Sequence, residues 1–118
     1  MIDTNIVILT GRITRDPDYR TTNTGSAVAD FGIAVGSGDN VYFGSVIAWN
    51  HTADYVRRYG RKGVRVLVQG RLTREAWTDR NGAKQERTRI TASSLTIFSD
   101  QRGDPPAQEQ GNLPYERE

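Results

Sequence analysis

Most of this chain consists of short segments in which apolar and polar side chains alternate, and this pattern limits the folds open to it. From Ala27 to Val35 every second residue is apolar, while Asp30 and Gly32 occupy intervening positions. The segment from Val64 to Leu72 alternates in the same way, with arginine on its polar side. A period of two is typical of strands that bury one face only. These segments therefore predict an all-β protein.

The remaining segments bring the expected number of strands to five. Asn5 to Ile13 is rich in β-branched residues, and Val41 to Trp49 returns from a short turn at 36–40. Asn81-Gly82 predicts the tip of a second hairpin, because this dipeptide favours a tight two-residue turn. The last strand is expected from about Arg87 to Phe98, with a bulge near residues 93 and 94. Turn-forming residues between 14 and 26 predict a long loop.

Only one segment follows a helical period. Between Asn50 and Gly60 apolar residues recur at spacings of three and four, and Gly60 and Gly63 supply a stop. Asn50 or Thr52 is the expected N-cap. Five strands with one short helix between the third and fourth is the order of the OB-fold, so we expect a five-stranded OB-fold barrel.

Charge and composition divide the chain near residue 100. Residues 1–99 hold 14 Lys and Arg against 9 Asp and Glu, a net charge of +5, whereas residues 100–118 hold 2 against 5, or −3. The second part is rich in Gln, Gly, Pro and Glu and is expected to be disordered. We therefore expect one domain over 1–99 and a disordered, mildly acidic tail over 100–118. The basic body suggests a polyanionic ligand, although solvated arginines would give the same charge.

Several classes of function lack the residues they need. The chain has no cysteine, which excludes disulfides and thiolate metal sites, and His51 is its single histidine. No spacing of His, Asp and Glu resembles a metal site, so we expect neither an enzyme nor a bound metal or cofactor. The sequence shows no membrane-length apolar run and no signal-peptide pattern. A cytoplasmic protein without a membrane partner is the expectation.

Aromatic side chains supply the strongest indication of a ligand. Phe43 and Trp49 share one face of their predicted strand, while Tyr42 lies on the other. A strand needs one apolar face for its core, so Phe43 and Trp49 are available to stack on flat ligands such as bases. Packing under the helix or in a subunit interface would explain these two rings equally well. Trp77 stands near the tip of a highly charged hairpin, and there ligand stacking is favoured over burial.

The order and spacing of several motifs resemble those of the bacterial single-stranded DNA-binding proteins over nearly all of residues 4–98. The most specific motif is Trp77-Thr78-Asp79 followed by Gly82. The others are Asn5 to Leu9, Gly11-Arg12, Asp16-Pro17 with Arg20 and Gly25, Phe31 to Ala34, Tyr59 to Gly63, and Val68 to Leu72.

This resemblance implies an OB-fold that binds and protects single-stranded DNA in replication, recombination and repair, without sequence preference. It also implies a nucleoid-associated homo-oligomer, usually a tetramer. The family's stacking aromatics correspond to Phe43, Trp49 and Trp77. Candidates for phosphate contacts, each of which could equally be an ordinary surface charge, are Arg12, Lys62, Arg71, Arg74, Arg80 and Lys84.

Two regions depart from the family pattern. Many members carry a further tryptophan near the loop that corresponds to 36–40, which here has no aromatic residue. The family's tail usually ends in an acidic run closed by an Ile-Pro-Phe-like tip, whereas here Glu116 to Glu118 follow Leu113-Pro114-Tyr115. Recruitment of replication and repair proteins therefore does not carry over to this tail. Such a tail is typical of a paralogue, of a phage- or plasmid-borne member, or of a truncated chain.

Two rival functions share the fold. A primosome-type OB protein would act mainly through a helicase-loading partner, and the Trp77-Thr78-Asp79 motif argues against it. A small OB-fold nuclease would need clustered carboxylates to hold a metal, and the acidic residues here are scattered along the chain.

Overall fold

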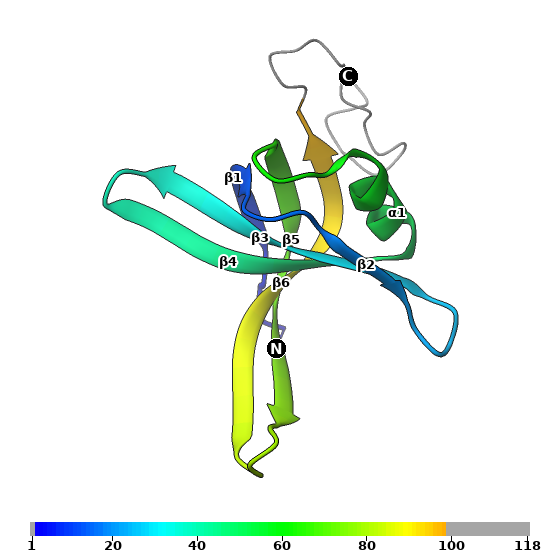
Figure 1. The fold of residues 1–118 in the computed structure, drawn as a ribbon. Coiled ribbons are helices and arrows are strands. Elements are labelled where there is room, and N and C mark those ends of the chain that lie inside the picture. Colours follow the sequence, from blue (N-terminus) through cyan, green and yellow to red (C-terminus); the bar gives the residue numbers. More distant parts are fainter. Residues whose placement is uncertain (1, 99–118) are drawn as a thin grey trace.

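A computed structural model describes residues 2–98, and Figure 1 shows their arrangement. The strands are β1 (Val7–Ile13), β2 (Asp18–Thr21), β3 (Ala27–Ser37), β4 (Asn40–Trp49), β5 (Arg65–Thr78) and β6 (Lys84–Ile97). Within the described part, the single helix α1 (Asn50–Tyr59) connects β4 to β5. The predicted all-β class and the place of its helix are confirmed. The tail expected at 100–118 lies outside the described residues.

The strand pairings form a ring, which is the arrangement expected of an OB-fold. The order is β1-β5-β6-β4-β3-β2, and β1 also pairs with β3, so the five long strands return to their starting point. Two of the contacts in this ring are narrow. The parallel contact of β4 with β6 spans Val46↔Ile90 and Ile47↔Thr91, and the β1–β3 contact spans Arg12↔Ala34 and Ile13↔Ile33.

The structure contains six strands rather than five, because part of the expected loop at 14–26 pairs with β3. Asp18 lies opposite Asp30 and Thr21 opposite Ala27, which makes β2 an antiparallel neighbour of β3. Pro17 has no N–H to donate and therefore favours a break before β2. The turn-forming residues therefore correctly predicted a break after β1. They did not predict that residues 18–21 would pair with β3.

The start of α1 also differs from the prediction. Trp49 occupies the N-cap position and no side chain caps the helix. Asn50 has a positive φ of 52°, and its Oδ1 accepts a hydrogen bond of 3.1 Å from the Ala27 backbone N–H. The asparagine side chain therefore joins the helix start to the start of β3. The helix ends as expected, with Arg57 and Arg58 in its last turn and Gly60 after it.

The hydrophobic core lies inside the ring of strands and extends to α1. Its fully buried members include Phe31, Ile33, Val46 and Leu95. The helix adds Ala53, Tyr55 and Val56 to this cluster. The Tyr55 hydroxyl accepts a hydrogen bond of 2.9 Å from the Ile97 backbone N–H, which fixes α1 against the end of β6.

The predicted bulge in β6 is present at residue 93. Gln69 lies opposite Ser94, but the next residue, Gly70, lies opposite Ala92, so Ser93 has no partner in the ladder. The backbones approach closely here, since a Cβ on Gly70 would clash with the Thr91 carbonyl oxygen. Glycine at position 70 is therefore a steric requirement of the pairing.

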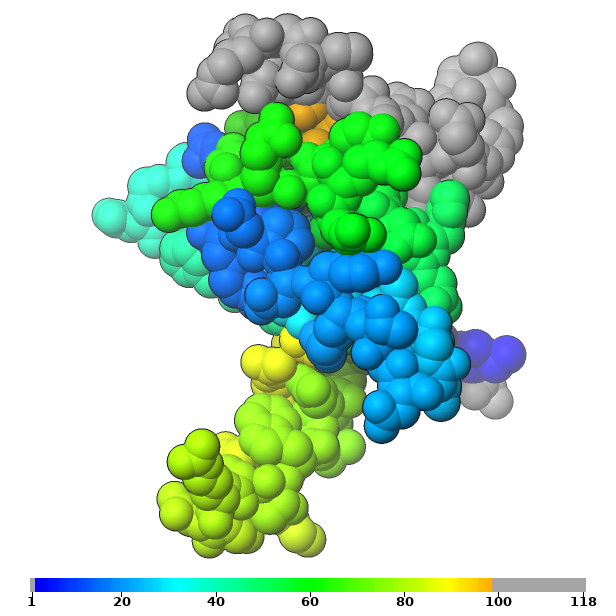
Figure 2. All heavy atoms as spheres, turned by 45° about the vertical axis from the view of Figure 1, so that its right-hand side comes forward, coloured from blue at the N-terminus to red at the C-terminus, as the bar shows by residue number. Residues whose placement is uncertain are grey.

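The far half of the β5–β6 hairpin projects from the molecule, as Figure 2 shows. Thr73 to Thr78 pair with Lys84 to Arg89 in this half. The predicted position of the tip at Asn81-Gly82 is confirmed, but the loop is longer than two residues. The Asp79 N–H donates to the Ala83 carbonyl at 2.9 Å, and Gly82, at a φ of 83°, donates its N–H to the Asp79 carbonyl at 3.0 Å. The hairpin places side chains on two sides, well away from the core.

Candidate nucleic-acid interface

The three aromatic residues singled out from the sequence are exposed. Relative exposure is 70% for Phe43, 43% for Trp49 and 43% for Trp77. Packing of Phe43 and Trp49 beneath the helix, which the sequence left open, is therefore wrong for this chain. Their use as stacking platforms remains a prediction, as does their alternative use in a subunit interface.

Strand register places these aromatics on one surface, the outer side of the ring. Trp49 lies opposite Val28, and Phe43 opposite Ala34. Trp77 lies two residues from Glu75 and four from Thr73, so the three share a side of β5. The Thr73 hydroxyl is 2.9 Å from that of Thr91, whose cross-strand partner is Ile47. Because Ile47 shares its side of β4 with Phe43 and Trp49, all three rings lie on what we call the aromatic face.

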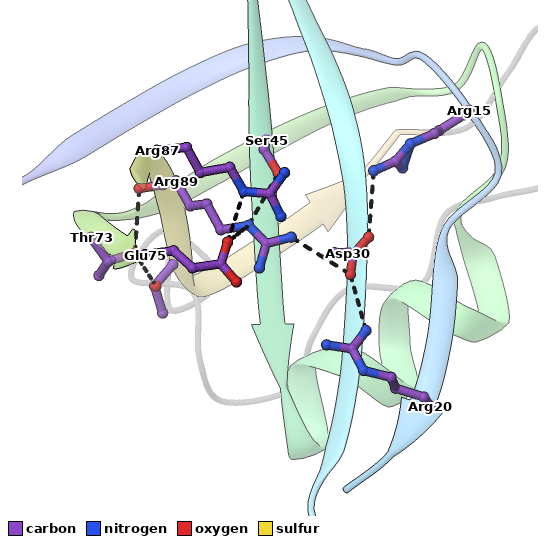
Figure 3. A network of polar contacts seen from close by, with 9 residues as sticks. Arg15, Arg20, Asp30, Ser45, Thr73, Glu75, Arg87 and Arg89 are labelled. Atoms are coloured by element: carbon purple, nitrogen blue, oxygen red, sulfur yellow. Dashed lines mark hydrogen bonds and ion pairs between the residues drawn. The ribbon is translucent and has the colours of Figure 1, made fainter. Parts of the chain in front are cut away.

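Asp30 forms the centre of an ion-pair network on this face, shown in Figure 3. Its carboxylate oxygens lie 3.4 Å from Arg15, 3.2 Å from Arg20 and 3.8 Å from Arg89. The Asp30 side chain is only 10% exposed. Burying a carboxylate is costly unless it is paired, and the three guanidinium groups provide that pairing.

Glu75 extends the network towards Trp77. Its Oε1 lies 2.7 Å from Arg87 Nε and 3.6 Å from Arg89 Nε, and Arg89 Nε also donates to the Ser45 hydroxyl at 3.3 Å. The hydrogen bond from Arg87, helped by the positive charges around it, holds the pKa of Glu75 below its usual value. The Arg87 guanidinium lies over the Trp77 ring, 5.5 Å from its centroid, which is cation–π geometry.

The network keeps a surplus of positive charge on the aromatic face. Two carboxylates face four guanidinium groups, and the Arg89 side chain is 9% exposed while Arg15, Arg20 and Arg87 are about half exposed. Each guanidinium has five N–H donors, so the half-exposed arginines keep donors free for anionic oxygens. Sequence reasoning did not select these arginines, because only the register brings them to Asp30 and Glu75.

The predicted phosphate contacts do not gather in one place. Arg12 lies opposite Ala34, and Arg71 opposite Thr91, so both belong to the aromatic face. Arg74 and Lys84 lie on the other side of the hairpin, where Arg74 pairs with Glu86. Arg74, Lys84 and Trp77 all line one open hollow of about 480 Å³.

The last two candidates lie in connections. Arg80 is in the β5–β6 turn, and Lys62 is in the segment between α1 and β5. The Lys62 backbone N–H donates to Asp16 Oδ1 at 2.8 Å, which holds this segment against the one before β2.

Residues 2–98 contain no group of three or more His, Cys, Asp or Glu side chains that could hold a metal ion. No helix among them has the length and apolar character needed to cross a bilayer. What the described chain does present is an exposed surface of aromatic rings and guanidinium groups.

Comparison with known proteins agrees with this geometry. The sequence model of the Single-strand binding protein family matches residues 4–98, nearly the whole described chain. The chain belongs to this family. Its members are named for binding and not for an enzymatic reaction.

Individual relatives point the same way. The chain is 39% identical to a single-stranded DNA-binding protein of Wolinella succinogenes over 103 residues, covering 80% of this chain and 64% of that protein. It is 38% identical to one of Helicobacter pylori, covering 86% of this chain and 62% of that protein. The chain therefore spans less than two thirds of the length of these relatives.

A solved structure shares the fold. The Plasmodium falciparum SSB complex with ssDNA superposes with a TM-score of 0.75 at 26% identity, covering 84% of this chain and 98% of that one. The likeness supports the OB-fold assignment.

Proposed function

We propose that this chain binds single-stranded DNA without sequence preference, by stacking bases on Phe43, Trp49 and Trp77. The observation that carries the proposal is that all three rings are exposed on one face together with a surplus of guanidinium groups. Stacking accepts any base, because every base has a π-face, and contributes about 1–3 kcal/mol per base. The names of the relatives and the ssDNA-bound neighbour support the same function.

Phosphate contacts complete the proposed binding mode. Arg12 and Arg71 are the earlier candidates on the aromatic face, while Arg74 and Lys84 border the hollow beside Trp77. Arg80 and Lys62 remain candidates from the connections. Because phosphate neutralisation releases counterions, the affinity should fall steeply as salt rises.

The proposal includes self-association, with a homotetramer as the expected form. It is supported by the exposed edge of β1, which pairs with β3 only at Arg12 and Ile13 and leaves its first half free on that side. Ile6 and Ile8 are 68% and 61% exposed beside this edge. Unpaired strand edges with apolar neighbours favour pairing with a second copy.

In the cell we place this activity in the cytoplasm, at the nucleoid, protecting single strands during replication, recombination and repair. Residues 1–99 would form the binding domain. Residues 100–118 lie outside the described part of the chain, and the proposal assigns no partner proteins to them.

Tryptophan fluorescence during titration with oligo-dT tests the function directly, because both tryptophans of the chain lie on the aromatic face. We expect strong quenching by oligo-dT, much weaker quenching by a duplex of equal length, and loss of affinity as salt rises. Saturation with oligo-dT without quenching would contradict stacking. Equal affinity for the duplex would contradict the preference for single strands.

A further inference from the structure

Asp30 joins arginines from three separate parts of the chain, as Figure 3 shows. Arg15 comes from the connection between β1 and β2, Arg20 from β2, and Arg89 from β6. The Asp30 side chain is nine-tenths buried, and so is that of Arg89. The other two guanidinium groups reach the same carboxylate from the solvent side, with 48% and 56% of their side chains exposed.

The register brings one of these arginines next to a predicted stacking position. Arg20 lies opposite Val28 on β3, and Val28 lies opposite Trp49 on β4. Residues that are direct cross-strand partners project to the same side of the sheet. Two strand spacings amount to roughly 10 Å. A nucleotide whose base lies on Trp49 carries phosphates on both sides of its sugar, so a guanidinium at this distance is within reach of one.

An unanchored arginine would be a poor phosphate ligand at this position. Its long side chain samples many rotamers in solvent, and binding must then order it at an entropic cost. The Asp30 carboxylate holds Arg20 at 3.2 Å before any ligand arrives and still leaves it N–H donors for a phosphate. The same carboxylate also repels a polyanion. Holding Arg20 in place should strengthen binding, whereas this repulsion should weaken it.

We propose that Asp30 is a positioning residue of the DNA-binding face, and that Arg20 and Arg15, which it holds, bind the phosphates beside the nucleotide stacked on Trp49. This inference rests on the proposed function. It adds two phosphate ligands that were not among the candidates from the sequence, and it gives the buried carboxylate a part in binding.

The first experiment compares Arg20→Gln with Arg58→Gln in oligo-dT titrations at several salt concentrations. Both substitutions remove one positive charge, but Arg58 is exposed in the last turn of α1 and makes no contact with the Asp30 network. We expect Arg20→Gln to weaken binding about tenfold, as for loss of a charged hydrogen bond. The slope of log K against log salt should also fall by about 1. Arg58→Gln should change the affinity less than twofold.

The second experiment uses the sign of the effect of Asp30→Asn. This substitution makes the chain more positive by one charge, so a purely electrostatic surface would bind oligo-dT more tightly and with a steeper salt slope. Positioning predicts the opposite, with severalfold weaker binding and a shallower slope because Arg20 and Arg15 are no longer held. In an Arg20→Gln background the same substitution should then weaken binding by a smaller factor.

The outcomes separate this inference from the function on which it rests. If the unmodified chain does not bind oligo-dT, the proposed function fails. If it binds but Arg20→Gln behaves like Arg58→Gln, or Asp30→Asn binds more tightly, only the positioning inference is overturned. A thermal melt of each variant accompanies the titrations. Should Asp30→Asn lose its cooperative melt, the comparison of Arg20→Gln with Arg58→Gln decides the matter, because Arg20 is half exposed and outside the core.

Discussion

The two sides of the β5–β6 hairpin carry similar charged residues in very different settings. On the aromatic face, Glu75 lies between Arg87 and Arg89, and Arg89 continues to Asp30 with its side chain 9% exposed. On the opposite side, Arg74 pairs with Glu86, and their side chains are 72% and 61% exposed.

The difference shows that an ion pair gains importance from what surrounds it. Water competes with an exposed pair and screens it, so such pairs contribute little to folding. A buried pair contributes little net stability either, but removing one partner leaves an uncompensated charge away from water. Single substitutions of charged residues should therefore lower the folding stability on the aromatic face but not on the opposite side.

Asp30→Ala should give the largest effect on stability. It leaves the buried Arg89 with Glu75 as its remaining carboxylate and removes the partner of two further arginines. We expect the free energy of unfolding to fall by about 3 kcal/mol, the lower end for breaking a buried pair. Urea denaturation followed by circular dichroism measures it. A loss of unfolding free energy below about 1 kcal/mol would mean that water screens the Asp30 network as it does the exposed pair of Arg74 with Glu86.

Trp77→Ala should have its main effect on binding. The ring is 43% exposed and touches Arg87, so its removal should leave the cooperative melt intact. We expect affinity for oligo-dT to weaken by about 1–3 kcal/mol, measured by the fluorescence of Trp49 or by calorimetry. Arg74→Ala, on the other side of the hairpin, is the comparison and should weaken binding less. If Trp77→Ala abolishes cooperative melting, the ring serves the fold and the stacking interpretation is wrong.

The pair on the opposite side should show the smallest effect. A double-mutant cycle of Arg74→Ala and Glu86→Ala, measured by urea denaturation, should give a coupling energy of about 0.2–1 kcal/mol. Raising the salt concentration should reduce it further. A coupling above about 2 kcal/mol would remove the distinction between the two sides.

Local sequence patterns predicted much of this fold because they report on local physics. Alternation located the long strands, Asn81-Gly82 marked the turn, and the polar residues near 93 marked the bulge. Alternation also placed Phe43 and Trp49 on one side of β4, as the structure shows. The short strand β2 was missed because its four residues include a single aromatic side chain, Tyr19, which is too little to show alternation.

The charged part of the candidate site could not be predicted for a related reason. Asp30 meets Arg89 only through the parallel contact of β4 with β6, which closes the ring. No local pattern reports on that contact. Sequence reasoning therefore selected basic residues without assigning them to one side of the sheet. Arg74 and Arg71 received equal weight although they project in opposite directions.

The bulge at Ser93 has a consequence for which residues of β6 meet solvent. Before the bulge the core-facing residues of β6 are even-numbered, as with Ile90, whereas after it they are odd-numbered, as with Leu95 and Ile97. The extra residue therefore displaces the alternation of side chains along β6 by one position. If the parity of Leu95 and Ile97 continued upstream without it, Arg89 would point inward. One unpaired serine therefore lets a single strand face the core at one end and carry guanidinium groups on the outer surface at the other.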